Sequence, residues 1–300
     1  MNSLTTYEKN HYFSIAMSDY KGTSFDNKDA LGERFSIVLI EKGNGIATID
    51  GKYISYIAPC VFCVNEKEHF IIPDSNENCI RAVFFHPCVI NSFLDFDNIS
   101  DSSPDAPVTI NQDKSLVKCI LQRDDRYVGK FNIGASTEKR AALILDGIHK
   151  MITDQSMANW PCRSRSYIME LLFLLDNLYV LDNSFEETYL ECIDEEFYPI
   201  LVYVYHNYEI KITVQDITDK FYVSRATLAK MFQKNVGESF LSYLNKLRIN
   251  LASTLLRDTM LPINEIMQRV GFTDNVHFLR TFKKYTGLSP SAYRERNCWM

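Results

Sequence analysis

Polar side chains suited to reading DNA gather in a short segment near the end of the chain. Asn275 and Arg280 lie five residues apart, and both side-chain types can make paired hydrogen bonds to base edges in the major groove. Lys283 and Lys284 follow them, in a position to contact phosphates. This spacing predicts the outward face of a helix that enters the major groove.

A second segment, 50 residues earlier, has a comparable but less polar face. Arg225, Thr227 and Lys230 can make polar contacts, whereas Ala226 and Ala229 offer only methyl groups, which suit thymine. We therefore expect the later segment to supply at least as much sequence information. The candidate DNA-contacting residues are Ser224, Arg225, Ala226, Thr227, Lys230, Lys234, Asp274, Asn275, Val276, Leu279, Arg280, Lys283 and Lys284.

Both segments belong to one helical unit that occurs twice. Three apolar positions upstream recur at an offset of 49 residues. Positions downstream recur at an offset of 50, so the second copy is one residue longer than the first. Because an inserted residue would rotate the apolar face of a helix by about 100°, this extra residue must lie in a turn. The repeat predicts two helix–turn–helix units that read one duplex. Downstream of the turn, Phe232, Lys234, Gly237, Ser239 and Tyr243 recur 50 residues later as Phe282, Lys284, Gly287, Ser289 and Tyr293.

Capping residues set the boundaries of the two units. Thr213 and Ser224 are good N-caps in the first unit, and Pro262 and Asp274 are suited to helix starts in the second. They predict helix–turn–helix units over 213–235 and 262–285. Between the units, apolar residues from 239 to 258 recur every three or four positions, which predicts one helix. A continuous helix would fix the distance between the readers, and successive major-groove faces lie about 34 Å apart.

Charge is divided unevenly along the 300 residues, whose length suggests about two domains. Residues 198–300 hold 14 basic and 8 acidic residues, a net charge of +6, whereas the preceding part holds 18 and 30, a net charge of −12. A basic face can bind phosphate, and the acidic part should be repelled by it. An ordinary solvated surface could carry the same excess, so charge alone does not decide the function.

The first third of the chain has the pattern of short antiparallel strands. Apolar runs at 35–40, 46–49, 53–57, 60–64, 70–72 and 80–85 are separated by turn residues. Asp50-Gly51 between two of these runs is a strong hairpin signal. The pattern predicts a sandwich or small barrel.

Helical periodicity follows from about residue 111. Residues 136–157 are expected to form a helix with Leu143, Ile144, Ile148 and Met151 on one face. Residues 164–181 are expected to form another, which either packs on the barrel or forms a dimer seam. We favour the dimer seam. The apolar run in this helix is interrupted by charges, and the N-terminus has no basic-then-apolar leader, so neither a membrane span nor a signal peptide is expected. The acidic stretch 186–196 is expected to link the two halves.

Residues that could serve catalysis or metal binding are scattered. His69 and His86 are isolated, without the clustered His and Glu that a metal cupin needs. Cys60 and Cys63 form a C-x-x-C without a second pair at zinc spacing, and on a strand their thiols would point to opposite faces. We expect buried structural cysteines, no metal, no cofactor and no enzymatic activity. A metal-dependent cupin enzyme fused to a helical domain is the weaker alternative.

The C-terminal hundred residues resemble the DNA-binding domain of the AraC/XylS family of transcription regulators. Two positions depart from the family pattern: the small residue usual in the first helix of each unit is Thr218 in one copy and Met267 in the other. Thr fits such a site, and Met is flexible enough to adapt. The resemblance is carried by Ser224, Leu228, Phe232, Gly237, Tyr243, Arg248, Ala252, Ile263, Ile266, Gly271, Phe272, Asp274, Phe278, Arg280, Phe282, Lys284, Gly287, Pro290 and Tyr293.

The N-terminal half resembles, more loosely, the cupin-like sensor domain that often precedes this module. The resemblance implies an α+β multidomain protein, with a cupin-like β-barrel and helical dimerisation region followed by an all-α, homeodomain-like double helix–turn–helix. The expected domains are a sensor barrel (1–110), a helical dimerisation region (111–185), an acidic linker (186–197) and a DNA-binding domain (198–298). Aromatic-rich positions suit a ligand pocket or a plain core, and the candidate ligand contacts are Phe35, Tyr53, Phe62, His69 and Phe84.

The resemblance also implies partners. We expect a cytoplasmic homodimer that binds double-stranded promoter DNA, acts with RNA polymerase and, in most cases, activates transcription. A small-molecule effector is one expected signal, and a protein partner is the alternative.

Overall fold

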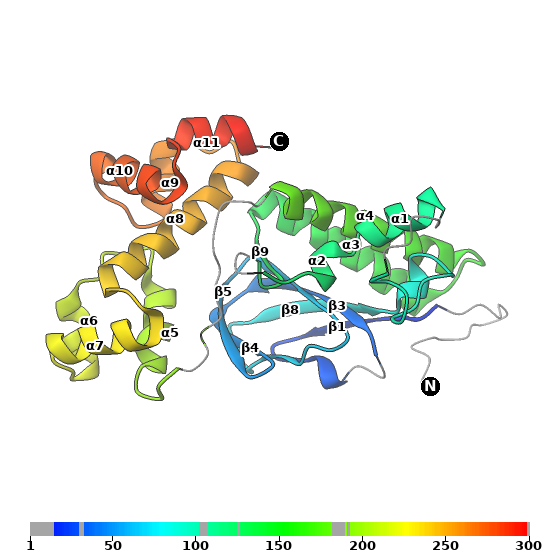
Figure 1. The fold of residues 1–300 in the computed structure, drawn as a ribbon, viewed down its shortest axis with the longest axis horizontal. Helices are drawn as coiled ribbons and strands as arrows, with labels where there is room; N and C mark the ends of the chain where they lie inside the picture. Colours follow the sequence, from blue (N-terminus) through cyan, green and yellow to red (C-terminus); the bar gives the residue numbers. More distant parts are fainter. Residues whose placement is uncertain are drawn as a thin grey trace.

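The computed structural model describes residues 15–29, 33–101, 107–124, 127–181, 190 and 193–298. Figure 1 shows two β-sheets with a pair of long helices along one side and a separate helical module beside them. The N-terminal domain is therefore α+β, and the C-terminal domain is all-helical. None of the helices in the described ranges is both long enough and apolar enough to cross a bilayer.

Two antiparallel sheets form the N-terminal domain. The five-stranded sheet has the order β1-β8-β3-β6-β9, and the four-stranded sheet has the order β2-β7-β4-β5. Short 3-10 helices at Asn27–Asp29 and Pro87–Val89 follow β2 and β8. The strands are β1 (Met17–Gly22), β2 (Phe25–Asp26), β3 (Phe35–Lys42), β4 (Asn44–Ile49), β5 (Lys52–Ile57), β6 (Cys60–Val64), β7 (Phe70–Ile72), β8 (Cys79–Phe85) and β9 (Lys130–Asn132).

The predicted hairpin at Asp50-Gly51 is confirmed. β4 pairs with β5 in a continuous antiparallel register from Asn44↔Ile57 to Ile49↔Lys52. Both turn residues have positive φ, 50° at Asp50 and 79° at Gly51. A two-residue turn of this kind matches the twist of the strands that it joins.

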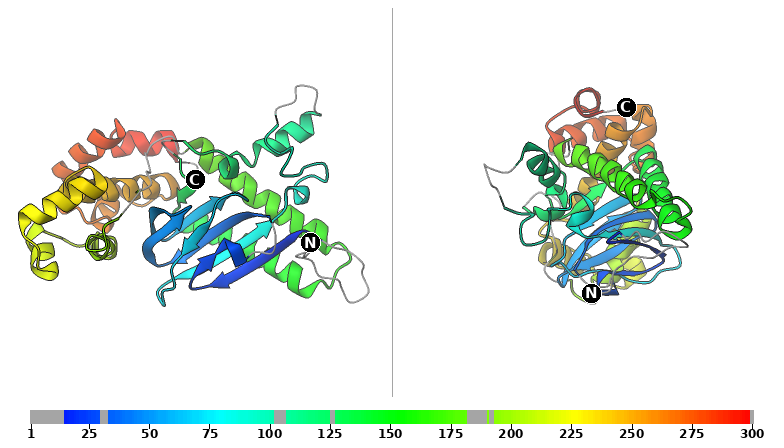
Figure 2. Two further views of the ribbon diagram at one scale, coloured as in Figure 1. Left: turned by 60° about the horizontal axis from the view of Figure 1, so that its bottom comes forward. Right: turned by 90° about the vertical axis from the view of Figure 1, so that its right-hand side faces the viewer.

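The five-stranded sheet is buried on both faces. Residues Val38, Ile40, Phe62 and Phe84 face the four-stranded sheet, whereas their neighbours along the strands face a pair of helices. These helices are α3 (Ala135–Asp154) and α4 (Trp160–Leu181), and Figure 2 shows them lying along the sheet. Burial on both faces explains why β3 is an almost unbroken apolar run instead of an alternating one.

The helical region departs from the predicted pattern in three ways. Residues 108–121 form two short helices, α1 (Val108–Ser115) and α2 (Lys118–Leu121), and the chain then returns to the sheet as β9. The helix expected at 164 begins at Trp160. Leu143, expected on the buried face of α3, is 62% exposed, because the buried arc of that helix passes through Ala141, Ile144 and Ile148. Most of the expected acidic linker lies outside the described residues.

The C-terminal module is built on one long helix. α8 (Phe240–Asp258) runs through the module, as predicted, and an apolar core lies toward each of its ends. The other helices are α5 (Tyr198–Asn207), α6 (Val214–Phe221), α7 (Arg225–Val236), α9 (Ile263–Arg269), α10 (Asn275–Thr286) and α11 (Pro290–Asn297).

Candidate DNA-binding surface

The first helix–turn–helix consists of α6 and α7. Thr213 Oγ1 accepts a hydrogen bond from Asp216 N at 3.2 Å, and Thr213 N donates to Asp216 Oδ2 at 2.7 Å, which completes a capping box at the start of α6. The Thr213 hydroxyl also donates a hydrogen bond to Asp216 Oδ2 at 2.7 Å, and this bond, followed by the one from Thr213 N, lowers the pKa of Asp216. The helix ends at Tyr222, whose φ of 55° makes the turn into α7.

The helix α7, called here the first reader, presents the predicted outward face. Ser224 Oγ caps it by accepting a hydrogen bond from Thr227 N at 3.0 Å. Leu228 and Phe232 are buried in the module core, whereas Arg225 and Lys230 are exposed. The exposed face also includes Ala226, Thr227 and Ala229.

The helix α10, called here the second reader, repeats this arrangement. Asp274 Oδ1 accepts a hydrogen bond from His277 N at 2.5 Å, so this residue acts as the N-cap. Phe278 and Phe282 are fully buried on the inner face. The outer face carries Asn275, Val276, Leu279 and Arg280, all of them exposed.

Matching ends and matching ring contacts confirm the repeat in three dimensions. The readers end at Gly237 and Gly287, whose φ angles are 73° and 74°. A β-carbon would meet nothing within 4 Å at either glycine, so the left-handed backbone is what favours glycine there. Phe232 lies 6.0 Å from Tyr243 between ring centroids, and the equivalent distance from Phe282 to Tyr293 is 5.5 Å.

The helix α8 and the Arg248 side chain join the two units rigidly. Nineteen residues of α-helix span about 28 Å. The Arg248 guanidinium donates to the carbonyl oxygens of Tyr208 and Ile210, and it lies 5.7 Å from the centroid of the Phe272 ring. Burial lowers the pKa of Arg248. Gly271, at a φ of 86°, leaves room for this arrangement, because a β-carbon there would lie 2.4 Å from Tyr208 O.

Both readers lie on the side of the module away from the sheets (Figure 1). Their outward side chains are therefore accessible while the N-terminal domain is docked. The arrangement offers two exposed helices, with amide and guanidinium groups on one and guanidinium and ammonium groups on the other. Such groups can make hydrogen bonds to base edges and ionic contacts to phosphates.

The two lysines predicted at equivalent positions have different surroundings. Lys234 Nζ pairs with Asp194 Oδ1 at 2.7 Å, and this contact is the largest cause of the lowered pKa of Asp194. Lys284 Nζ lies 5.3 Å from the centroid of the Tyr285 ring, and the described residues provide no carboxylate partner for it. Lys284 and the neighbouring Lys283 are thus better placed than Lys234 to contact phosphate.

Besides Asp194, sequence reasoning missed Gln215, which contacts a reader side chain. Gln215 Oε1, on the exposed side of α6, accepts a hydrogen bond from Arg225 Nη2 at 2.8 Å. The two residues are ten positions apart and lie on different helices, so helical periodicity could not pair them. The polar type of Gln215, on the exposed side of the first helix, is the only signal that the sequence offered.

The candidate ligand contacts of the N-terminal domain lie in separate places. Phe35 is buried against the helices α3 and α4, whereas Phe62 and Phe84 are buried between the sheets. Tyr53 lies on the outer side of β5 among residues that pack on α5. His69 is half-buried and its Nε2 lies 3.0 Å from Asp26 Oδ1. The structure therefore does not bring these five residues together around one cavity.

The cysteines and histidines are also dispersed. Cys60 faces the four-stranded sheet and Cys63 faces the helices, on opposite sides of β6, as predicted. His86 Nδ1 accepts a hydrogen bond from Cys88 N, and burial is the largest cause of its lowered pKa. No group of three or more metal-ligating side chains occurs in the described part of the chain.

Comparisons with known proteins match the helical module. Residues 217–296 match a family model described as a helix-turn-helix domain. The chain is 32% identical to the lactose operon transcription activator of Staphylococcus xylosus over 42% of its own length and 46% of that protein. It therefore spans less than half of that relative.

Two further comparisons cover different shares of the chain. The transcriptional activator RhaS of an Enterobacter species (strain 638) is 22% identical over 86% of this chain and 84% of its own length, so this match includes the N-terminal domain. Among solved structures, an AraC-type transcriptional regulator from Chromobacterium violaceum is 26% identical over 35% of this chain and 93% of its own, with a TM-score of 0.32. The resemblance expected from the sequence is thereby confirmed for the C-terminal domain.

Proposed function

We propose that this protein is a sequence-specific DNA-binding regulator of transcription of the AraC type, because residues 217–296 match a family model described as a helix-turn-helix domain and similar transcription activators match the same part of the chain. The two readers would enter successive major grooves of one promoter site. The DNA contacts would come from the residues predicted on α7 and α10, with the second reader supplying most of the base discrimination. Activation through contact with RNA polymerase is the mode that we favour.

One observation supports this function above the others. Two capped recognition helices present exposed polar faces, and a single continuous helix, α8, holds them apart. An enzyme would need a cleft with converging reactive groups, whereas DNA recognition needs this repeated, outward-facing geometry. The basic C-terminal part also suits a polyanion.

The N-terminal domain is proposed to receive the signal. A cupin-like barrel that binds a small molecule is one form of this proposal, although Phe25, Phe62, Phe70 and Phe84 fill much of the space between the sheets. Control by a protein partner is the second form. Both require that the domain transmit a change to the DNA-binding module.

A homodimer through α3 and α4 completes the proposal. Phe173 and Val180 on α4 are 52% and 62% exposed, and Leu143 on α3 is 62% exposed. Large apolar side chains exposed on two neighbouring helices make this helix pair the candidate interface. Two protomers would then place four readers on the DNA, in two pairs.

A selection of genomic DNA fragments by the purified full-length chain tests the function. We expect enrichment of a site with two elements about one helical turn apart, and binding by fluorescence anisotropy that weakens steeply with salt. A repeat of the selection with metabolite extract separates the two forms of signal. If no fragment binds in a salt-sensitive manner, the proposed function is wrong.

A further inference from the structure

The last residue of α8 caps a helix of the other domain. Asp258 is fully buried, and its Oδ2 accepts a hydrogen bond from Gly134 N at 2.6 Å and one from Thr137 Oγ1 at 3.4 Å. Gly134 is the N-cap of α3 and has no side chain with which to cap it. The carboxylate that stabilises the start of α3 therefore comes from the DNA-binding module.

A buried arginine completes this contact. Arg257 is 3% exposed, and its Nε donates to Asp258 Oδ1 at 2.6 Å. Its Nη2 donates to Asn132 O, at the end of β9, at 2.6 Å. Ser136 Oγ donates to Asp258 O at 2.9 Å. The charged pair is thus hydrogen-bonded to both the strand before Gly134 and the helix after it, as a buried pair must be to offset its desolvation.

The fit at Gly134 is too close for any other residue. A β-carbon on Gly134 would lie 2.5 Å from Asp258 Cβ. Its backbone, with φ −87° and ψ 170°, would accept alanine without strain. The glycine is therefore required by the approach of α8 and not by the local backbone.

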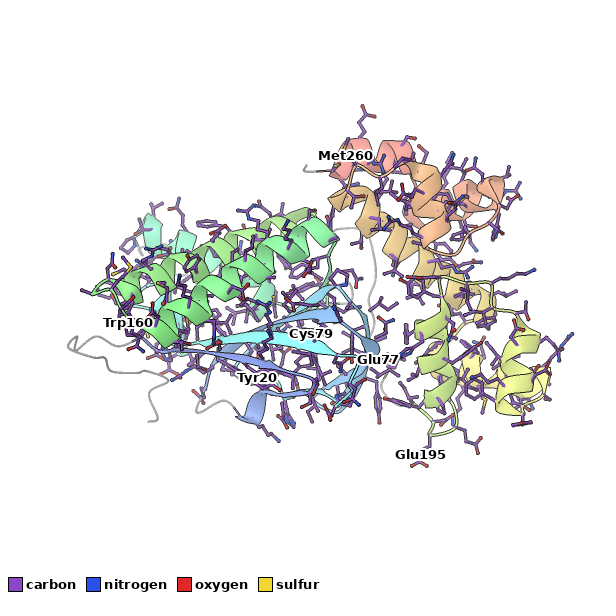
Figure 3. All side chains as sticks on the ribbon, turned by 180° about the vertical axis from the view of Figure 1, so that it is seen from behind. Tyr20, Glu77, Cys79, Trp160, Glu195 and Met260 are labelled. Atoms are coloured by element: carbon purple, nitrogen blue, oxygen red, sulfur yellow. The ribbon has the colours of Figure 1, made fainter. Side chains whose placement is uncertain are left out.

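A second contact between the two domains lies at the end of the helical module that holds the first helix–turn–helix unit. Ile46 and Ile57 of the N-terminal domain join the apolar core of the first unit, and His206 on α5 lies 3.2 Å from Glu77 Oε2. Figure 3 shows Glu77 at the side of the sheets that faces the module and Met260 just beyond the end of α8. Crevices with mixed polar and apolar walls lie between these two patches, and Asn132 lines two of them.

We propose that Arg257 and Asp258, seated on Gly134, form a latch that couples the N-terminal domain to the second helix–turn–helix. The latch lies five residues before α9, and on its other side it supports α3, which packs on α4. A displacement of the first turn of α3 is then transmitted to the end of α8, next to the second helix–turn–helix unit. Because coupled equilibria are reciprocal, DNA binding also changes the stability of the first turn of α3.

Two substitutions in different domains test the latch. Asp258→Ala removes the capping carboxylate, and Gly134→Ala forces a methyl group into the contact without altering the DNA-binding module. Hydrogen exchange by mass spectrometry on the full-length chain should show faster exchange at 134–138 in both variants, on the order of tenfold or more, as expected for a lost hydrogen bond to a charged group. Exchange in α10 should not change.

Matched controls keep this result specific. Gly147→Ala makes the same change within α3, where the new methyl group meets Tyr167 on α4. Glu265→Ala removes a carboxylate from the second unit, where its partner is the exposed Arg269. Neither control should increase exchange at 134–138. If Asp258→Ala does not fold, the paired change Arg257→Met with Asp258→Leu removes both buried charges together, and Gly134→Ala still tests the contact.

The coupling between DNA binding and the latch rests on the proposed function. It is tested by adding a duplex that was enriched in the DNA selection. Wild-type protein should show altered exchange at both α10 and 134–138 on DNA binding, whereas Gly134→Ala should show the change at α10 only. DNA protection at α10 with no change at 134–138 in the wild type would overturn the coupling. If α10 itself does not respond, the DNA-binding proposal fails instead, and the DNA-free comparison still decides whether the latch joins the domains.

Discussion

Arg225 Nη2 donates a hydrogen bond to Oε1 of Gln215 at 2.8 Å, so the first helix of the unit orients a side chain of its reader. The contact forms between two exposed residues, and water can replace it. The contact preorganises Arg225, because it limits the directions in which the guanidinium can point before DNA binds.

We predict that Gln215→Ala weakens DNA binding through Arg225 alone. The loss should be about 0.5–1.5 kcal/mol, the usual net value of one hydrogen bond. A double-mutant cycle with Arg225→Ala, measured by fluorescence anisotropy, checks the mechanism. In the Arg225→Ala background, Gln215→Ala should have no further effect. Additive losses would instead mean that Gln215 contacts DNA independently.

Arg280 and Lys284 should differ in the kind of binding that they support. Arg280→Ala should relax discrimination at one base position and cost about 1–3 kcal/mol on the cognate site. Lys284→Ala should weaken all sequences alike and reduce the salt slope by about 0.9. Titrations of cognate and scrambled duplexes over a range of salt concentrations distinguish these outcomes. Equal losses from Arg280→Ala on every duplex would remove its assignment as a base reader.

Phe282 should be required for the stability of the second unit. It is fully buried and lies against Phe278 and Tyr293. Phe282→Ala should lower the free energy of unfolding by about 3–5 kcal/mol, the range for a core aromatic. Urea denaturation measures this loss, and Leu279→Ala is the control, because Leu279 lies on the exposed face of the same helix. A comparable loss from the control would contradict the orientation of α10.

The capping box of α6 should add to stability in a pH-dependent manner. The pKa of Asp216 is lowered in the folded state from its ordinary 3.8. The stabilisation is therefore fully present above the unfolded value and is lost as the pH falls through the folded value. The difference in Tm between wild type and Asp216→Asn should be constant above about pH 5 and shrink below it. In a Thr213→Ala background this pH dependence should largely disappear.

The exposed apolar side chains of α3 and α4 should govern self-association. Phe173→Glu places a charge on the proposed dimer surface and should yield monomers in analytical ultracentrifugation. Val276→Glu, at a side chain that is 63% exposed on the second reader, is the matched control and should leave the assembly unchanged. A monomeric wild-type protein would contradict the proposed homodimer, and an unaffected dimer in the Phe173 variant would place the interface elsewhere.

Much of the helical module followed from the sequence because its signals are local. Caps such as Thr213 and Asp274 lie three residues from the groups that they satisfy, and both readers carry an N-cap and a terminal glycine. The strand β9 was missed because its three residues, Lys130 to Asn132, include only one apolar side chain and so form no apolar run. Leu143 was misplaced because helical spacing shows that an apolar stripe exists, but not which part of it the neighbouring sheet covers.

The contacts between distant segments had no signal in the sequence. Lys234 looks like any exposed lysine until Asp194, 40 residues earlier, is brought beside it. In the same way, Gly134 looks like a simple helix start. Only the folded chain shows that the space in front of it is occupied by Asp258.

The separation of Gly134 and Asp258 along the chain also bears on the order in which the protein is made. The capping carboxylate lies 124 residues after the amide that it binds. At ordinary rates of synthesis, this interval corresponds to about 6 to 25 s during which α3 has left the ribosome without its cap. The first turn of α3 can therefore receive this cap only after the end of α8 has emerged, so this docking contact between the two domains forms late in folding.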